Sequence, residues 1–197
     1  MKAAVITKPY HIEIQEVADP GELKENEVLI KVSLTGICGS EVHAFKGTHP
    51  WRIPPVISGH ELVGVVVGVG EKVKSVSKGK RVTVEPHVGC GDCDYCRNNL
   101  YNLCLSKRIL GTPDWVGSFA EYIVVPENTV IPVPDNVSDE LAALTEPLAV
   151  GMHAARKLEI NPGDSVLVLG AGPIGLSICL AAKTMNAGKI LITDISD

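Results

Sequence analysis

The sequence has few aromatic residues and no excess of basic ones. Aromatic side chains make up 4% of the 197 residues, so a core must be built mostly from Val, Ile, Leu and Ala. Lys and Arg number 18 against 23 Asp and Glu, and the net charge of −5 argues against a nucleic-acid partner or an anionic membrane surface. The hydrophobic fraction of 45% excludes global disorder.

No export signal or membrane span is expected. Residues 1–9 hold a short apolar run that Lys8 and Pro9 interrupt, which is not the pattern of a signal peptide. The uncharged stretch 165–182 imitates a membrane span, but its three glycines and one proline are arranged as in a phosphate-binding loop. We therefore expect a cytoplasmic protein, whose six cysteines are metal ligands or free thiols before they are disulfides.

The chain changes character near residue 138. Before it, short β-branched segments predict strands over residues 3–7, 11–17, 27–34, 62–69, 81–84, 119–125 and 131–133. After it, the pattern predicts helices from residue 138 and over 148–157, a strand over 165–169, a helix over 173–186 and a strand over 189–193. The last three segments open a βαβ unit that cannot cover both faces of a sheet. We therefore expect two domains, 1–155 and 156–197, with the second unfinished and the chain a fragment.

One motif is a group of four cysteines with the spacing C-x2-C-x2-C-x7-C: Cys90, Cys93, Cys96 and Cys104. Four thiolates on a small irregular loop satisfy a tetrahedral zinc ion with no open position, which is the structural kind of site. An iron–sulfur cluster usually has a shorter last spacing followed by proline, whereas Leu105 follows here. Unrelated free thiols and a pair of disulfides are the competing interpretations. The clustering favours structural zinc in a lobe over residues 89–105.

A second set of possible metal ligands lies on separate segments: Cys38, His60, Glu61 and Glu146. A thiolate, an imidazole and a carboxylate can hold a zinc ion and leave one coordination place open, which is the catalytic arrangement. The residues alone leave the alternative open that Cys38 is buried packing and His60 an ordinary core histidine. Close by, Ser40 and His43 fit a helix cap and a surface residue.

A glycine-rich segment lies between a predicted strand and a predicted helix. Residues 170–175 match G-x-G-x-x-G, the phosphate-binding pattern of dinucleotide domains. Gly170 would permit the tight turn, Gly172 the approach of the pyrophosphate, and Gly175 the packing of helix on strand. The helix N-terminus would then face the phosphates. The alternative is a glycine-rich turn in an ordinary α/β unit.

The flanking residues refine the prediction of a cofactor. Pro173 would start the helix, where an amide hydrogen is not needed, and Ile174 would pack beside the cofactor. Asp194, at the end of the following strand, is placed to bind both ribose hydroxyls and to repel a 2′-phosphate. This pattern favours NAD over NADP.

Taken together, these motifs resemble the zinc-dependent medium-chain alcohol dehydrogenases, in particular the branch of sorbitol, threonine and butanediol dehydrogenases. The family signature G-H-E-x2-G-x5-G-x2-V is matched by Gly59, His60, Glu61, Gly64, Gly70 and Val73. The four cysteines match the family's structural zinc site in spacing and order, and the resemblance covers all 197 residues. It implies a β-rich GroES-like catalytic domain followed by the start of an α/β Rossmann domain, which is incomplete.

The resemblance also implies roles for single residues. Cys38 and His60 match the ligands of the catalytic zinc, and Glu61 matches the third ligand of the polyol branch. Glu146 matches the position of a Cys ligand in classical alcohol dehydrogenases, so it is the other candidate, or a neighbour that exchanges onto the metal. Two further residues that follow Cys38 match family positions. Ser40 matches the residue whose hydroxyl takes the alcohol proton, and His43 matches the residue that passes this proton to solvent.

The reaction implied is the reversible NAD-linked oxidation of a secondary alcohol, a polyol or a hydroxylated amino acid to the ketone. Zinc would lower the pKa of the bound hydroxyl. Ala44 occupies the position of a substrate-contacting Tyr in sorbitol dehydrogenases, which argues against sorbitol itself. Candidate pocket residues, with surface or packing positions as the alternative, are His49, Trp51, Arg52 and Trp115.

Two functions of other classes stay open. An unfinished nucleotide domain would suit a non-catalytic zinc-binding protein. An interaction or oligomerisation module that keeps only the fold is the second, although such a module needs no Cys38, Ser40 or His43. Family members are often dimers or tetramers, so the resemblance also admits a homo-oligomer. A quinone reductase of the same superfamily is disfavoured by both sets of metal ligands.

Overall fold

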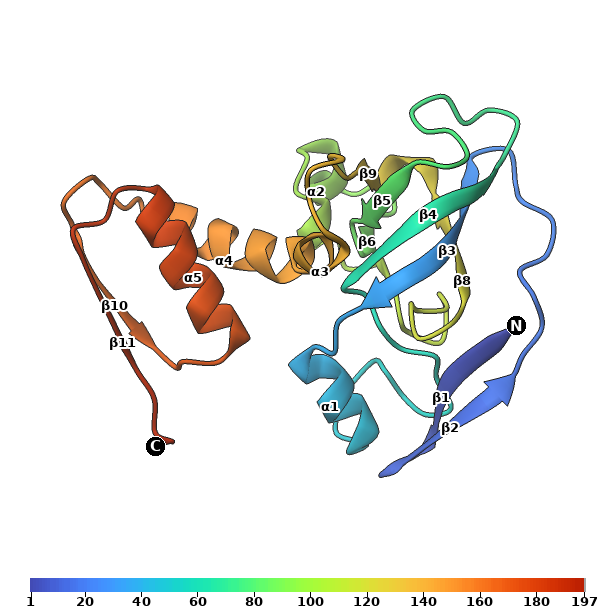
Figure 1. Ribbon diagram of the computed structural model, residues 1–197, viewed down its shortest axis with the longest axis horizontal. Coiled ribbons are helices and arrows are strands. Elements are labelled where there is room, and N and C mark those ends of the chain that lie inside the picture. The colour runs from blue at the N-terminus through green and yellow to red at the C-terminus, as the bar shows by residue number, and fades with distance from the viewer. Residues whose placement is uncertain (197) are drawn as a thin grey trace. The chain divides into compact units, whose positions relative to one another are not determined.

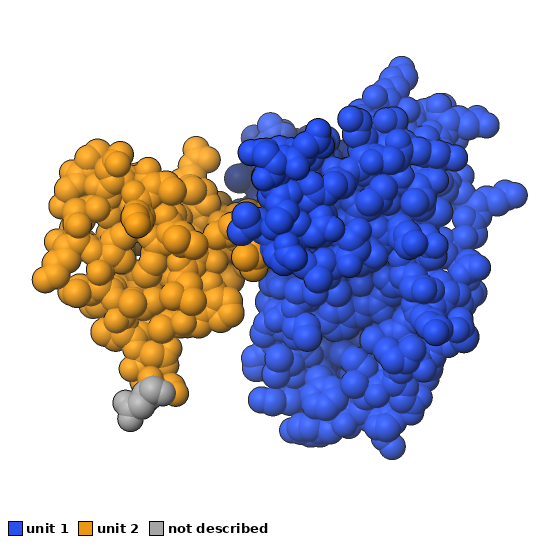
Figure 2. Space-filling model, in the orientation of Figure 1, with its two compact units in different colours: residues 1–143 blue, residues 144–197 orange. Residues whose placement is uncertain are grey.

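The computed structural model describes residues 1–196, which form two compact units (Figure 2). The first unit spans residues 1–143 and the second begins at residue 144. The sequence instead placed the domain boundary after residue 155. The difference is helix α4 (Thr145–Lys157), which packs against helix α5 (Pro173–Thr184) of the second unit. No helix among the described residues is both long and apolar enough to cross a lipid bilayer.

The first unit is built on a five-stranded antiparallel sheet with the order β8-β3-β4-β5-β9 (Figure 1). Its strands are β3 (Glu27–Thr35), β4 (Leu62–Val69), β5 (Arg81–Val84), β8 (Tyr122–Pro126) and β9 (Val130–Pro132). Two further antiparallel pairs are β1 (Lys2–Lys8) with β2 (His11–Glu16), and β6 (His87–Val88) with β7 (Arg108–Ile109). The helices are α1 (Gly39–Phe45), α2 (Asp94–Arg97) and α3 (Asp139–Ala143), and short 3-10 turns cover Tyr101–Leu103 and Glu127–Thr129.

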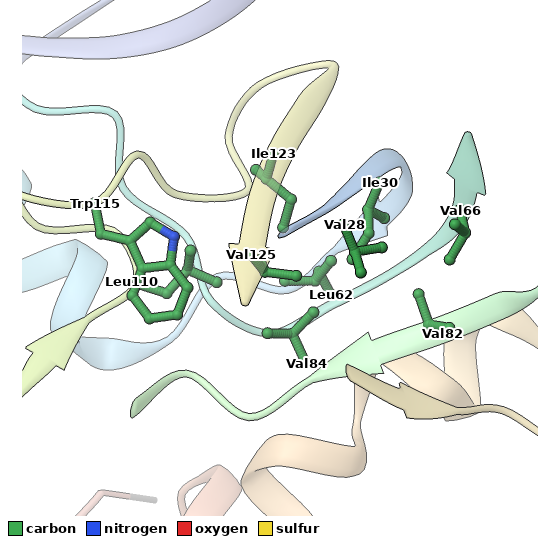
Figure 3. Close-up of a cluster of buried hydrophobic side chains, with 10 residues drawn as sticks. All are labelled: Val28, Ile30, Leu62, Val66, Val82, Val84, Leu110, Trp115, Ile123 and Val125. Atoms are coloured by element: carbon green, nitrogen blue, oxygen red, sulfur yellow. The ribbon is translucent and has the colours of Figure 1, made fainter. Parts of the chain in front are cut away.

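The core of this unit is aliphatic, as the shortage of aromatic residues requires. Alternate residues of the strands point inward and pack with two loop residues (Figure 3): Val28, Ile30, Leu62, Val66, Val82, Val84, Leu110, Trp115, Ile123 and Val125. Burial of each such side chain contributes about 1.5–3 kcal/mol. Trp115 is 6% exposed, and its indole Nε1 donates to the Val124 carbonyl at 2.9 Å. It is a packing residue, the alternative that the sequence left open for it.

The pairing of β3 with β4 brings two distant segments together. Thr35 at the end of β3 pairs with Leu62 at the start of β4. The register continues one step beyond the strands, where Gly36 N donates to the Glu61 carbonyl at 2.6 Å. The segment that leads into α1 and the segment that ends at Glu61 therefore lie at the same end of the sheet, and both carry predicted metal ligands.

The described residues of the second unit, 144–196, form two helices and a two-stranded sheet. β10 (Ser165–Leu169) and β11 (Lys189–Thr193) are parallel, and α5 connects them, as the sequence predicted for a βαβ unit. The helix ends at Thr184, two residues before the predicted end at residue 186. A Cβ at Gly151 would lie 2.6 Å from the Ser177 backbone, so helices α4 and α5 approach closely at a glycine.

Candidate functional site

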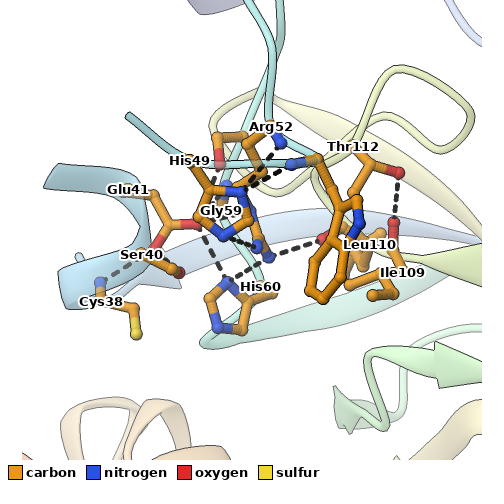
Figure 4. Close-up of polar contacts among 12 residues, drawn as sticks. Cys38, Ser40, Glu41, His49, Arg52, Gly59, His60, Ile109, Leu110 and Thr112 are labelled. Carbon is orange, nitrogen blue, oxygen red and sulfur yellow. Dashed lines mark hydrogen bonds and ion pairs between the residues drawn. The ribbon is translucent and has the colours of Figure 1, made fainter. Parts of the chain in front are cut away.

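Cys38 and His60, which are separated by a helix and a long loop, meet at the end of the β3–β4 pair (Figure 4). Cys38 is the residue before α1 and serves as its N-cap, and His60 comes two residues before β4. Gly59 holds a φ of 94°, where a non-glycine residue would be strained, and this turn leads into His60. Possible ligand atoms of Cys38, Glu41 and His60 lie within 4.8 Å of one another.

Glu41 organises this cluster from a buried position, since it is 3% exposed. Its Oε1 accepts hydrogen bonds from three groups: Ser58 Oγ at 2.9 Å, Gly59 N at 3.3 Å and His60 Nδ1 at 3.0 Å. Its Oε2 accepts from two more: Cys38 N at 3.1 Å and Ser40 Oγ at 3.3 Å. One carboxylate therefore ties the segment that carries Cys38 to the segment that carries His60.

The negative charge of Glu41 and the positive charge of His60 stabilise each other. Burial raises the pKa of Glu41, but the hydrogen bond and charge of His60, with Arg52 and Ser58, lower that pKa to about 2. Burial lowers the pKa of His60, but its contacts with Cys38 and Glu41 raise that pKa to about 9 in the metal-free protein. The hydrogen bond of His60 also lowers the pKa of Cys38, which favours the thiolate that binds metals.

Glu61 lies beside the cluster with its carboxyl group close to Gly36, the residue after β3. A Cβ at Gly36 would lie 2.3 Å from Glu61 Oε2, so only glycine leaves room for this carboxyl position. Burial raises the pKa of Glu61, and a hydrogen bond to Cys38 opposes that rise. Cys38, His60 and Glu61 together offer sulfur, nitrogen and oxygen ligands, which is a donor set that fits zinc.

The predicted proton-transfer residues both lie on α1. Ser40 is the second residue of the helix, and the N-cap is Cys38. The interpretation of Ser40 as the helix cap is therefore wrong. The Cys38 amide binds the Glu41 carboxylate instead, as in a capping box. His43 is exposed, and its Nδ1 lies 3.2 Å from Thr48 Oγ1. Glu146 belongs to the second unit, where it lies in the first turn of α4.

The other candidate pocket residues divide into exposed and buried ones. Trp51 is 61% exposed, whereas Arg52 is 5% exposed and directs its guanidinium at Glu41 and His60. His49 Nδ1 accepts the backbone N–H groups of Trp51 and Arg52 at 3.1 and 3.0 Å. His49 therefore shapes the loop on which Arg52 lies.

The four cysteines of the lobe gather as the spacing predicted. The Sγ atoms of Cys90, Cys93, Cys96 and Cys104 lie within 4.8 Å of one another, and all six cysteines of the chain are free thiols, without a disulfide. A Cβ at Gly89 would lie 2.6 Å from Cys96 Sγ, so the backbone wraps closely around the thiol group. Backbone N–H groups of Asp92 and Cys93 lower the pKa of Cys90 to about 6. The arrangement can hold one tetrahedral metal ion through sulfur alone.

The glycine-rich segment forms a turn between β10 and α5. Gly170 has a φ of 106°, and Gly172 is the N-cap of α5, which begins at Pro173. A Cβ at Gly175 would lie 1.9 Å from the Gly170 carbonyl oxygen, whereas a Cβ at Gly172 would meet no atom within 4 Å. Asp194 Oδ2 accepts the Ala171 N–H at 2.6 Å, and this bond lowers the pKa of Asp194. Ile174 is partly exposed at the start of the helix.

Comparison with known proteins identifies the family. Residues 24–135 match the alcohol dehydrogenase GroES-like domain. Sorbitol dehydrogenase of Bacillus subtilis is 41% identical over 99% of this chain, which covers 56% of that relative. The chain belongs to the zinc-dependent medium-chain alcohol dehydrogenases. It spans about half the length of the curated relatives that it matches.

Solved structures agree with this membership in the alcohol dehydrogenase family. Galactitol-1-phosphate dehydrogenase from Escherichia coli aligns with a TM-score of 0.93 at 30% identity, over 100% of this chain and 56% of that one. An alcohol dehydrogenase from Escherichia coli CFT073, in complex with NADH, aligns with a TM-score of 0.92 at 38% identity, over 100% of this chain and 57% of that one. The GroES-like domain and the start of a Rossmann domain are thus confirmed as the fold class.

The sequence did not identify the role of two residues in the cluster around Cys38 and His60. Glu41 was not selected at all, although an acidic residue three positions after the N-cap of a helix is the mark of a capping box. Arg52 was considered as a substrate contact or as a surface or packing residue, because the sequence carries no sign that its side chain contacts Glu41 and His60. Both residues contact His60. No local sequence pattern predicts these contacts.

Proposed function

We propose that the protein oxidises a secondary alcohol or polyol to the ketone with NAD, reversibly, at a zinc site held by Cys38, His60 and Glu61. The observation that carries the proposal is the buried Glu41 carboxylate, which holds one ring nitrogen of His60 and the backbone of Cys38. Neighbouring relatives that act on sorbitol and on galactitol 1-phosphate support the polyol class.

The ligand set follows from the hydrogen bonds around Glu41. A carboxylate only accepts, so the bond to Glu41 requires the proton of neutral His60 on Nδ1 and leaves Nε2 for a metal. Glu41 already receives five donors and is occupied as an acceptor, so Glu61 is the carboxylate ligand that we favour. Bound zinc would supply a Lewis acid that makes the substrate hydroxyl more acidic. The exchange of Glu146 onto the metal stays a prediction.

Ser40 and His43 are proposed to carry the proton away. The Ser40 hydroxyl makes a long bond of 3.3 Å to Glu41, which it can exchange for a bond to a substrate hydroxyl. His43 lies three residues further along α1, on the same side of the helix, and its exposed ring can pass the proton to water. The reaction would then need no other acid or base on this helix.

The remaining predicted sites complete the proposal. Cys90, Cys93, Cys96 and Cys104 are proposed to hold a structural zinc ion. The turn at residues 170–175 is proposed to receive the pyrophosphate of NAD, with Asp194 released from Ala171 to bind the ribose hydroxyls. The relative solved with NADH supports the nicotinamide cofactor.

Zinc content tests the two metal sites directly. The purified chain should contain two zinc ions, and Cys38→Ser and Cys104→Ser should each remove one of them. Cys179→Ser is the matched control, because this free thiol on α5 belongs to neither cluster. Formation of NADH from a panel of polyols and diols then tests the reaction, and it should depend on Cys38. Retention of both zinc ions by Cys38→Ser would contradict the proposed catalytic site.

A further inference from the structure

Arg52 carries a permanent charge into the interior of the first unit, because its side chain is 6% exposed. Its Nε lies 3.2 Å from Glu41 Oε1, within ion-pair distance but without a hydrogen bond. One terminal nitrogen lies 3.2 Å from His60 Nδ1 and donates to the Leu110 carbonyl at 3.1 Å (Figure 4). The other terminal nitrogen lies 3.4 Å from His49 Nε2. A guanidinium is costly to bury unless charged and polar partners surround it, so this position requires an explanation.

Two of the contacts of Arg52 are with Glu41 and with His60, the proposed metal ligand that Glu41 would orient. Glu41 Oε1 accepts from the neutral groups Ser58 Oγ and Gly59 N. The same oxygen contacts Nδ1 of His60 at 3.0 Å and Nε of Arg52 at 3.2 Å. The guanidinium is permanently charged, so Arg52 holds the buried Glu41 carboxylate in the position from which it contacts His60.

The second anchor of Arg52 determines where its charge can lie. The bond to Leu110 fastens the guanidinium to a fully buried core residue that follows the cysteine lobe. The planar group therefore cannot turn away from Glu41 without losing a buried hydrogen bond. A residue that only filled space at this position would need neither a charged group nor these polar contacts.

We infer that Arg52 is a positioning residue of the proposed catalytic metal site, which fixes the Glu41 carboxylate so that Glu41 orients His60 toward the metal. The inference rests on the proposed function, because it requires a metal at Cys38, His60 and Glu61. Arg52 contacts neither substrate nor metal in this role.

The test is the zinc affinity of the two sites in the full chain, measured by competition with a chromophoric chelator. Arg52→Met should lower the affinity of the catalytic site about 10–100-fold, as the loss of an outer partner of a ligating histidine does, and leave the cysteine lobe unchanged. Arg52→Lys keeps the charge without the planar fork, so it should fall between wild type and Arg52→Met. Arg81→Met is the control, because Arg81 also binds a carboxylate and a carbonyl, at Asp139 and Val137.

A double-mutant cycle separates positioning from general stability. If Arg52 acts through Glu41, Arg52→Met combined with Glu41→Gln should bind zinc no more weakly than Glu41→Gln alone. A lower melting temperature of Arg52→Met with unchanged zinc affinity at the catalytic site would overturn the inference. If Arg52→Met fails to fold, Arg52→Lys decides: wild-type zinc affinity in that variant overturns the inference, and a selective loss supports it. A wild-type chain that binds zinc only in the lobe would instead refute the proposed function.

Discussion

Glu41 Oε1 lies 3.0 Å from Nδ1 of His60, and this contact determines which ring nitrogen is left for the proposed metal. Because the carboxylate cannot donate, the neutral imidazole must carry its proton on Nδ1, and Nε2 keeps its lone pair. The same carboxylate accepts the Cys38 amide at 3.1 Å. A single side chain on α1 thus fixes the ring direction of one proposed ligand, His60, and the backbone of the other, Cys38.

Glu41→Gln tests this relationship. The amide keeps the shape but removes the charge, and it brings two N–H groups into a place where five donors already converge. We expect zinc affinity at the catalytic site to fall about 10–100-fold while the cysteine lobe keeps its zinc. Chelator competition measures both affinities in one sample. Equal loss of zinc from both sites would indicate a general folding defect and contradict the specific role.

Gly36→Ala tests Glu61 as the third ligand. The new Cβ would lie 2.3 Å from Glu61 Oε2, so the carboxyl group must move away from its present position. Gly39→Ala is the matched control, because a Cβ there meets no atom within 4 Å. We expect Gly36→Ala to lose catalytic zinc and Gly39→Ala to keep it, as metal analysis of the purified variants would show. If both variants keep two zinc ions, Glu61 is not a ligand in this position.

The sequence predicted the parts of the fold that have a local pattern. The strands of the main sheet alternate β-branched residues, and the βαβ unit carries a glycine turn between strand and helix, so both were recognisable. The two-residue strands β6 and β7 and the four-residue helix α2 were not predicted. These short elements have no periodicity, and they form because the lobe brings them together.

The sequence offered candidate ligands for the site but not the residues that contact them. Cys38 and His60 belong to recognisable motifs, whereas Arg52 reaches His60 only because the loop between α1 and β4 brings the two side chains together. Contacts across that distance depend on tertiary packing. A pattern of residue types along the chain does not predict such contacts.

Glu127 gives a pH dependence that is separate from the metal sites. Its carboxylate accepts the backbone N–H groups of Lys74 and Ser75, each at 2.6 Å, and these bonds lower its pKa below the ordinary 4.5. A lowered pKa in the folded state means that the stabilisation is present above pH 4.5 and is lost as pH falls through the folded value. In urea unfolding from pH 7 to pH 3, we expect Glu127→Gln to lose stability at neutral pH and to differ less from wild type in acid. A constant difference across this range would contradict the assignment.

Gly175 and Gly172 should respond to alanine in different ways, although both belong to the same turn. A Cβ at Gly175 would lie 1.9 Å from the Gly170 carbonyl, so Gly175→Ala must separate α5 from β10 and cost about 1–3 kcal/mol in the free energy of unfolding. Gly172 has open space around it and a φ of −71°, which alanine adopts without strain. Gly172→Ala should therefore fold as wild type and lose only affinity for NAD, because the new methyl group occupies the path by which the pyrophosphate approaches the backbone. Thermal unfolding and titration with NAD separate the two effects. If Gly172→Ala binds NAD as tightly as wild type, the phosphates do not lie against this turn.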